Sequence, residues 1–178
     1  GSDWRLEFVN FSDIGKARNY GVSQAQGRYI SFLDGDDLFS ANWLTLAAHS
    51  AKTHLDSTIW HPELNIYFGA QERIFYHRDM EEAPWQNADI IASNHWTALA
   101  FASTEYLRSV PHPDSDLTNQ IGYEDWGWNE RTIGNGSMHK IVHGTAHLIR
   151  VKRANSLLMK SNALRSIPSP SGRLLDSL

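Results

Sequence analysis

Cysteine is absent from the 178-residue sequence, which excludes a disulfide scaffold, a thiolate zinc site and a cysteine nucleophile. Long apolar runs are also absent, because none approaches the roughly 18 residues of a membrane-spanning helix. No basic stretch followed by an apolar block marks a signal peptide. Basic residues are few, since 16 Lys and Arg accompany 20 Asp and Glu and the net charge is −4. This balance argues against a nucleic-acid partner, which a basic surface would favour.

The composition that remains is that of a globular protein. Hydrophobic residues make up 41% of the chain and charged residues 20%, and the length suits one domain. We expect this domain over residues 3–166, a flexible tail over residues 167–178, and a cloning scar at Gly1-Ser2. The seven Trp are many for this size, and Trp favours binding surfaces.

The opening third of the chain alternates predicted strands and helices. Apolar, β-prone runs predict strands over residues 7–11 and 28–33. Helical spacing predicts helices over residues 15–26 and 41–54, the second with Ser40 as its N-cap. This alternation favours a parallel α/β sheet.

Shorter elements are expected in the rest of the chain. Apolar runs predict further strands over residues 57–61, 64–69, 73–77, 98–102, 138–143 and 146–151. Helices are predicted over residues 103–107, 123–133 and 154–165, the first of them capped by Ser103.

The first acidic cluster follows the predicted strand 28–33. Asp34, Asp36 and Asp37 place three carboxylates within four positions. Ligands of open α/β sheets bind beyond the carboxyl ends of strands, and clustered carboxylates suit a hard divalent cation. An Asp-rich β-turn without a ligand explains the cluster equally well. An EF-hand is excluded, because Phe39 stands where its loop requires Gly.

The second acidic cluster, Glu124-Asp125-Trp126, opens the predicted helix 123–133. It is compatible with a general base beside an aromatic platform for a sugar ring. Acidic residues in a first helical turn also stabilise the helix dipole, so a structural role stays open. A glycosidase is disfavoured, because its two carboxyl groups lie about 5–9.5 Å apart across the scissile bond, and adjacent residues do not supply that arrangement. Pairing of one of them with the Asp34 cluster stays open.

Together these motifs resemble glycosyltransferase family 2. The similar segments are Gly15-Lys16-Ala17-Arg18-Asn19-Tyr20-Gly21, then Ala25-Gln26-Gly27, the strand that follows, Asp34-Gly35-Asp36-Asp37 and Glu124-Asp125-Trp126. The resemblance covers residues 7–45 well and 90–157 more loosely. It implies an α/β protein with a GT-A fold, in which helices flank a mixed sheet. It also implies an inverting transfer of a sugar from a UDP- or GDP-type donor to a saccharide or related hydroxyl.

The resemblance also implies roles for individual residues. Asp36 would be the main ligand of a Mn²⁺ or Mg²⁺ ion, with Asp34 near the metal or the ribose. Asp125 would be the general base, with Glu124 beside it. The other implied contacts are Arg18 and Asn19 with the nucleotide and Trp126 with the acceptor.

Two later assignments keep their alternatives. His147 is the expected additional metal ligand, but a buried, hydrogen-bonded histidine is the competing interpretation. Arg150, Lys152 and Arg153 either hold the diphosphate or form a solvated charged surface.

The start of the chain differs from the family pattern. Members open with a strand, a helix and a second strand, and no such segment precedes Trp4. We therefore expect an N-terminally truncated domain with an exposed sheet edge, and either self-association through that edge or a partner that supplies the missing half. A non-catalytic carbohydrate-binding remnant and a metal-dependent phosphohydrolase are the rival hypotheses. We expect a cytoplasmic location, with the membrane face as the place of action.

Overall fold

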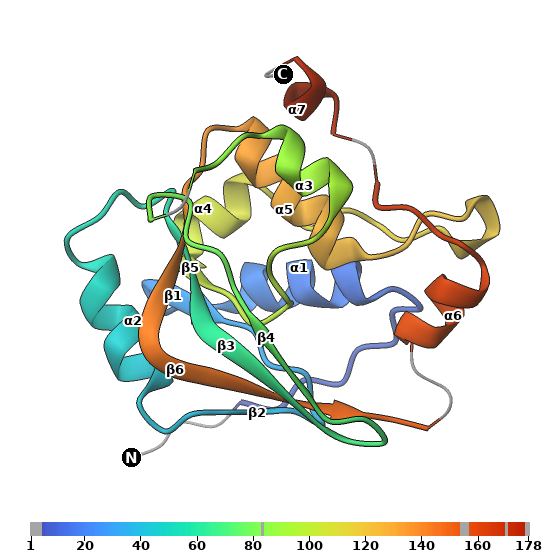
Figure 1. Ribbon diagram of the computed structural model, residues 1–178, viewed down its shortest axis with the longest axis horizontal. Coiled ribbons are helices and arrows are strands. Elements are labelled where there is room, and N and C mark those ends of the chain that lie inside the picture. The colour runs from blue at the N-terminus through green and yellow to red at the C-terminus, as the bar shows by residue number, and fades with distance from the viewer. Residues whose placement is uncertain (1–4, 83, 154–156, 170, 177–178) are drawn as a thin grey trace.

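The structure, a computed structural model, describes residues 5–82, 84–153, 157–169 and 171–176. Gly1-Ser2, the expected cloning scar, lies outside these ranges. The described residues form a six-stranded mixed sheet in the order β1-β5-β3-β6-β2, with β4 paired to β3 (Figure 1). The strands are β1 (Tyr29–Ser31), β2 (Leu38–Phe39), β3 (Ile59–Gly69), β4 (Arg73–Tyr76), β5 (Phe101–Ser103) and β6 (His139–Val151).

The centre of the sheet is the parallel pair β3 and β6. The sequence predicts two short strands in each of these regions, whereas the structure has one long strand in each. A register shift between Pro62 and Leu64 lets β3 continue past the irregularity. Gly144 has a φ of +71°, which glycine adopts without strain, so β6 also continues. The other pairings are antiparallel, so the sheet is mixed and not parallel throughout.

Helices cover both faces of this sheet (Figure 1). They are α1 (Ile14–Gln24), α2 (Trp43–Ala51), α3 (Ala88–Ala92), α4 (Thr104–Ser109), α5 (Glu124–Gly134), α6 (Leu157–Ala163) and α7 (Gly172–Leu175). Ile59 and Trp60 are neighbours on β3 and therefore point to opposite faces. Trp60 packs in the core beneath α2, whereas Ile59 packs with Val22 of α1 and Trp128 of α5. The expected α/β sheet with flanking helices is thereby confirmed.

Caps explain where several helices begin. The Asp13 side chain accepts a hydrogen bond from the backbone amide of Lys16 and caps α1. Ser103 caps α4, as the sequence predicts, by accepting from the amide of Tyr106. Ser40 does not cap α2, which begins at Trp43, because its hydroxyl accepts from the amide of Ala146 on β6 instead.

Residues 5–11 are not a strand, although the sequence predicts one over residues 7–11. Phe8 is 91% exposed and Leu6 79% exposed. A strand needs a partner to satisfy its backbone groups, and no described strand pairs with this segment. This apolar, β-prone run therefore has β propensity without a sheet to join.

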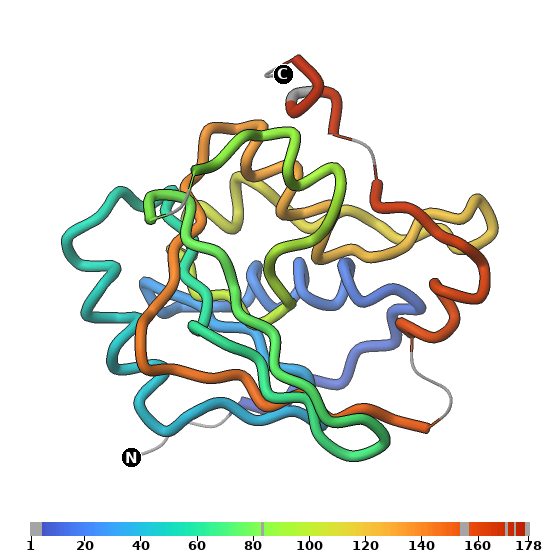
Figure 2. Tube along the Cα trace, in the orientation of Figure 1, coloured from blue at the N-terminus to red at the C-terminus, as the bar shows by residue number. Residues whose placement is uncertain are grey.

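The C-terminal segment also differs from the flexible tail that the sequence predicts. Figure 2 shows it running beside the loop that precedes α5. The amide of Gly122 donates to the carbonyl of Ile167, and Leu174 of α7 is 1% exposed. Leu174 packs with Ile90, Trp96 and Ile133 in a third core cluster, so this segment contributes to the hydrophobic core.

Candidate active site

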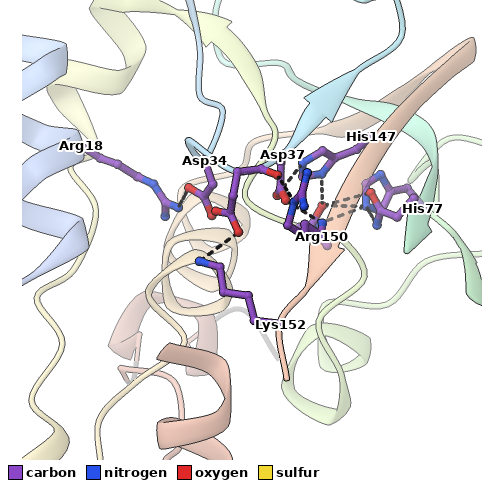
Figure 3. Close-up of polar contacts among 10 residues, drawn as sticks. Arg18, Asp34, Asp37, His77, His147, Arg150 and Lys152 are labelled. Carbon is purple, nitrogen blue, oxygen red and sulfur yellow. Dashed lines mark hydrogen bonds and ion pairs between the residues drawn. The ribbon is translucent and has the colours of Figure 1, made fainter. Parts of the chain in front are cut away.

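The Asp-rich loop lies between β1 and β2, next to the end of β6 (Figure 3). Its turn is closed by a hydrogen bond of 3.0 Å from the amide of Asp37 to the carbonyl of Asp34. Because β2 pairs with β6, the loop meets the residues that end β6. The amide of Arg150 donates to Asp37 at 2.9 Å, and Nζ of Lys152 lies 2.9 Å from the Asp36 carboxylate.

Arg18 of α1 joins the two acidic clusters. Its Nη1 donates to Glu124 at 2.7 Å, and its Nη2 lies 3.3 Å from the carboxylate of Asp34. A planar guanidinium can serve two carboxylates at once, which an ammonium group does less well. Burial alone would lower the pKa of this guanidinium. The carboxylates of Glu124, Asp34 and Asp125 nevertheless raise it above its ordinary value. A charged arginine therefore lies between the two motifs.

Asp125 is the most perturbed carboxyl group of the site. Its pKa is raised to about 7, mainly by burial and further by the charges of Glu124 and Asp34. Arg18 and the hydrogen bond from the amide of Trp126 act in the opposite direction. A carboxylate with a pKa near neutrality is a more effective proton acceptor than an ordinary aspartate.

Asn94 is a neighbour of Asp125 that the sequence patterns do not reveal. Its Nδ2 lies 3.4 Å from a carboxylate oxygen of Asp125. Asn129 lies one helical turn after Asp125. Its side-chain Nδ2 donates to the side-chain Oδ1 of Asn94 at 2.9 Å and so fixes the orientation of the Asn94 side-chain amide. Asn94 lies in a segment without regular structure, so no periodicity could have indicated its role.

Two predicted ligand-binding side chains also make contacts within the protein. The amide group of Asn19 both donates to and accepts from the backbone of His112, each at 2.9 Å, and ties α1 to the loop after α4. The indole nitrogen of Trp126 donates to the carbonyl of Ile90 at 2.7 Å. Trp126 is half-buried and joins α5 to α3, which leaves part of its ring accessible.

His147 is almost completely buried and lies beside the Asp-rich loop. Its Nε2 is 3.2 Å from the carboxylate of Asp37, which is the neighbour of the predicted ligand Asp36. Within the ranges that the structure describes, no group of three or more His, Asp or Glu side chains is arranged to hold a metal ion. The structure therefore does not bring Asp34, Asp36 and His147 together as one ligand set.

The chemistry of Asp34 and Asp36 nevertheless suits a hard divalent cation. Their side chains are 44% and 35% exposed, and carboxylate oxygens are the donors that Mg²⁺ and Mn²⁺ take. Each carboxylate lies beside one cationic side chain, Arg18 or Lys152. These two cations offset part of the negative charge of the loop when no divalent ion is bound.

Tyr67 of β3 also lies close to both acidic clusters, although the segment that contains it carries no motif. Burial raises the pKa of Tyr67, Arg73 lowers it, and the charges of Asp125 and Asp37 raise it further. The guanidinium carbon of Arg73 is 4.1 Å from the centre of the Tyr67 ring, a cation–π contact. Only the pairing of β3 with β4 brings these two residues together.

The sequence model of the family described as Glycosyl transferase family 2 matches residues 4–107, more than half of the chain. The chain belongs to glycosyltransferase family 2. The match includes Arg18, Asn19 and the Asp-rich loop, and it ends before Glu124 and Asp125. No curated protein sequence matches the chain. For this family 2 glycosyltransferase, the curled mixed sheet with its flanking helices is a GT-A-like fold.

Among the residues that the structure describes, no helix has the length and apolar character needed to cross a membrane.

Proposed function

We propose that this chain catalyses an inverting, metal-dependent transfer of a sugar from a nucleotide-sugar to an acceptor hydroxyl. One observation supports this most directly: Arg18 contacts both Asp34 and Glu124, so one site contains the Asp-rich loop and the Glu124-Asp125 pair. The first group is suited to a nucleoside diphosphate with its cation, and the second to an acceptor.

Asp125 is the proposed general base. Its raised pKa lets it accept the proton of an acceptor hydroxyl as that oxygen attacks the anomeric carbon. Attack opposite the departing nucleoside diphosphate inverts the anomeric centre and requires no covalent intermediate. Asn94 holds the carboxylate in place, and the accessible part of Trp126 offers an apolar surface to a saccharide acceptor.

Asp34 and Asp36 are the proposed ligands of Mn²⁺ or Mg²⁺. When bound, such an ion would neutralise the charge that develops on the leaving diphosphate. His147 can act as a further ligand only if its Nε2 leaves Asp37. Arg18, with Asn19 behind it, and Lys152 are the proposed contacts of a UDP- or GDP-type donor.

Calorimetry with UDP and GDP, each with and without Mn²⁺, tests donor binding. We expect binding that depends on the cation, and no binding at millimolar nucleotide would overturn the proposal. With a panel of nucleotide-sugars and saccharides, Asp125→Asn should lower transfer by about 10²- to 10⁴-fold and leave nucleotide affinity nearly unchanged. Asp114→Asn, at an aspartate with a 61% exposed side chain, is the matched control and should change neither.

A non-catalytic carbohydrate-binding domain is the second candidate. The observation in its favour is that Arg18 and Lys152 already lie beside the carboxylates of Asp34 and Asp36. This alternative predicts saccharide binding that does not depend on nucleotide or Mn²⁺, together with no transfer by the unaltered protein.

A further inference from the structure

A series of polar side chains leads from the interior of the sheet to the Asp-rich loop. His77 follows β4, Thr97 precedes β5, His147 lies on β6 and Asp37 precedes β2. Figure 3 shows His77, His147 and Asp37 in this order. The side chains of His77, His147 and Asp37 are at least nine-tenths buried, so water contributes little to their hydrogen bonds.

The proton of His77 is fixed by its neighbours. Its Nδ1 lies 2.6 Å from the carbonyl of Pro62, which can only accept, so Nδ1 carries the hydrogen. Its Nε2 therefore accepts, from Nδ2 of Asn65 at 2.8 Å and from the amide of Thr97 at 3.2 Å. Burial lowers the pKa of His77 to about 3, which agrees with a neutral ring.

The Thr97 hydroxyl lies between Asn65 and His147. Because Nδ2 of Asn65 donates to His77, its Oδ1 is the atom 3.3 Å from the Thr97 hydroxyl. Nδ1 of His147 is also 3.3 Å from this hydroxyl, so Thr97 is within hydrogen-bond distance of the ring on the side away from Asp37. His147 is thus held from behind, with its Nε2 at 3.2 Å from Asp37.

Asp37 connects this series to the loop. One carboxylate oxygen lies beside His147, and the other accepts from the amide of Arg150 at 2.9 Å. Its own amide closes the turn to Asp34. A change in the position of His147 would therefore reach the loop that carries Asp34 and Asp36.

We propose that Thr97 and His77 are positioning residues, which fix His147 and, through Asp37, hold the Asp-rich loop in the conformation that presents Asp34 and Asp36. The significance of this loop for catalysis rests on the proposed function. The positioning itself is a property of the protein without ligands and can be measured without them.

Thr97→Val removes the hydroxyl and keeps the shape of the side chain. Amide hydrogen exchange of the metal-free protein should show about tenfold faster exchange at Asp37 and Arg150, since a hydrogen bond in the series is lost. Thr97→Ser should restore the slow exchange. Thr132→Val is the matched control, because its buried hydroxyl lies 2.8 Å from another buried histidine, His139, and it should leave both amides unchanged.

The second measurement is the affinity for Mn²⁺ in the presence of UDP or GDP, which should fall about tenfold in Thr97→Val and not in Thr132→Val. Unchanged exchange at Asp37 and Arg150 in a folded Thr97→Val protein would overturn the proposal, as would equal effects of Thr132→Val. If Thr97→Val does not fold, Thr97→Ala takes its place under the same criteria. Faster exchange in Thr97→Val, together with no nucleotide binding by the unaltered protein, would support the positioning role and reject the proposed transferase function.

Discussion

At the scale of single residues, the charge balance of the site depends on Arg18. This one guanidinium contacts a carboxylate from each acidic motif, and it is 8% exposed. Two acidic residues, the buried Glu124 and the half-buried Asp125, follow one another at the start of α5. Arg18 compensates mainly Glu124, which it contacts directly, and the pKa of Asp125 stays high.

The pH dependence of transfer follows from this arrangement. Asp125 must lose its proton to act as a base, and its pKa is about 7. We expect kcat/KM to rise about tenfold for each pH unit below 7 and to level off above it. Initial rates between pH 5 and 9 measure this dependence, and a flat profile through pH 7 would count against Asp125 as the base.

Asp125 should also reduce the stability of the folded protein at neutral and higher pH. Its folded pKa lies above its unfolded value of 3.8, so the folded state retains a proton that the unfolded chain loses, and stability decreases as pH rises from about 4 through 7. Asp125→Asn should therefore raise the melting temperature at pH 8, by a few degrees or more. Glu124→Gln is the contrasting variant and should lower it, because Arg18 loses a buried partner.

At the scale of elements, the position of α1 depends on its contact with the loop after α4. A Cβ atom added to Gly15 would lie 2.3 Å from the carbonyl oxygen of Pro113, which is too close for any contact. Gly15 therefore permits the approach that lets Asn19 bond to His112 and directs Arg18 toward the carboxylates.

Two glycines of α1 offer a matched test of this approach. Gly15→Ala should destabilise the protein by about 1–3 kcal/mol, because α1 must move away from the loop. Gly21→Ala meets no atom within 4 Å and should stabilise the helix by about 0.5–1 kcal/mol. Urea unfolding measures the free energy of unfolding of both variants. Equal changes in the two would contradict the close contact at Gly15.

At the scale of the whole molecule, buried histidines make stability dependent on pH in the acidic range. Burial lowers the pKa of His77, His112 and His139 to about 3, and it lowers that of His61 well below the ordinary value. Such a histidine must be protonated when the chain unfolds below pH 6.5, so each favours unfolding by about 1.4 kcal/mol per pH unit.

Acid unfolding is the expected consequence. At pH 5.5 the four histidines together cost roughly 6 kcal/mol, which is comparable with the whole stability of many domains. The raised pKa values of Asp125 and Glu130, both about 7, act in the opposite direction and offset roughly half of this cost between pH 7 and 5.5. We expect cooperative unfolding between pH 4 and 5 by circular dichroism. Replacement of one of these histidines, in His112→Phe, should lower the pH at which half of the protein is unfolded. Retention of full structure at pH 4 would contradict this prediction.

Self-association is a second prediction for the whole molecule. Among the described residues, β1 pairs only with β5, so its other edge has no strand partner. Phe8, in the segment before α1, is 91% exposed and adds apolar surface. Free edges and apolar segments favour pairing between chains. The apparent mass in light scattering should rise with concentration. Phe8→Lys should weaken this effect, whereas Leu55→Lys, at a leucine that is 78% exposed, should not.

The sequence by itself determined the elements whose signals are local. The helices α1, α2 and α5, the strand β1, and the cap at Ser103 depend on patterns within a few residues, and the structure contains all of them. The two acidic motifs could be recognised for the same reason. The residues 7–11 show the limit of such patterns, because a strand also requires a partner elsewhere in the chain.

Only the tertiary structure decided how the site is assembled. Arg18 and Glu124 are 106 positions apart, and Thr97 and His147 are 50 apart, so no local pattern predicts either contact. The pKa of Asp125 and the neutral state of His77 follow from burial, which depends on everything that packs around them. The sequence thus determined which chemical groups the protein has, and folding decided which of them meet and what charge they carry.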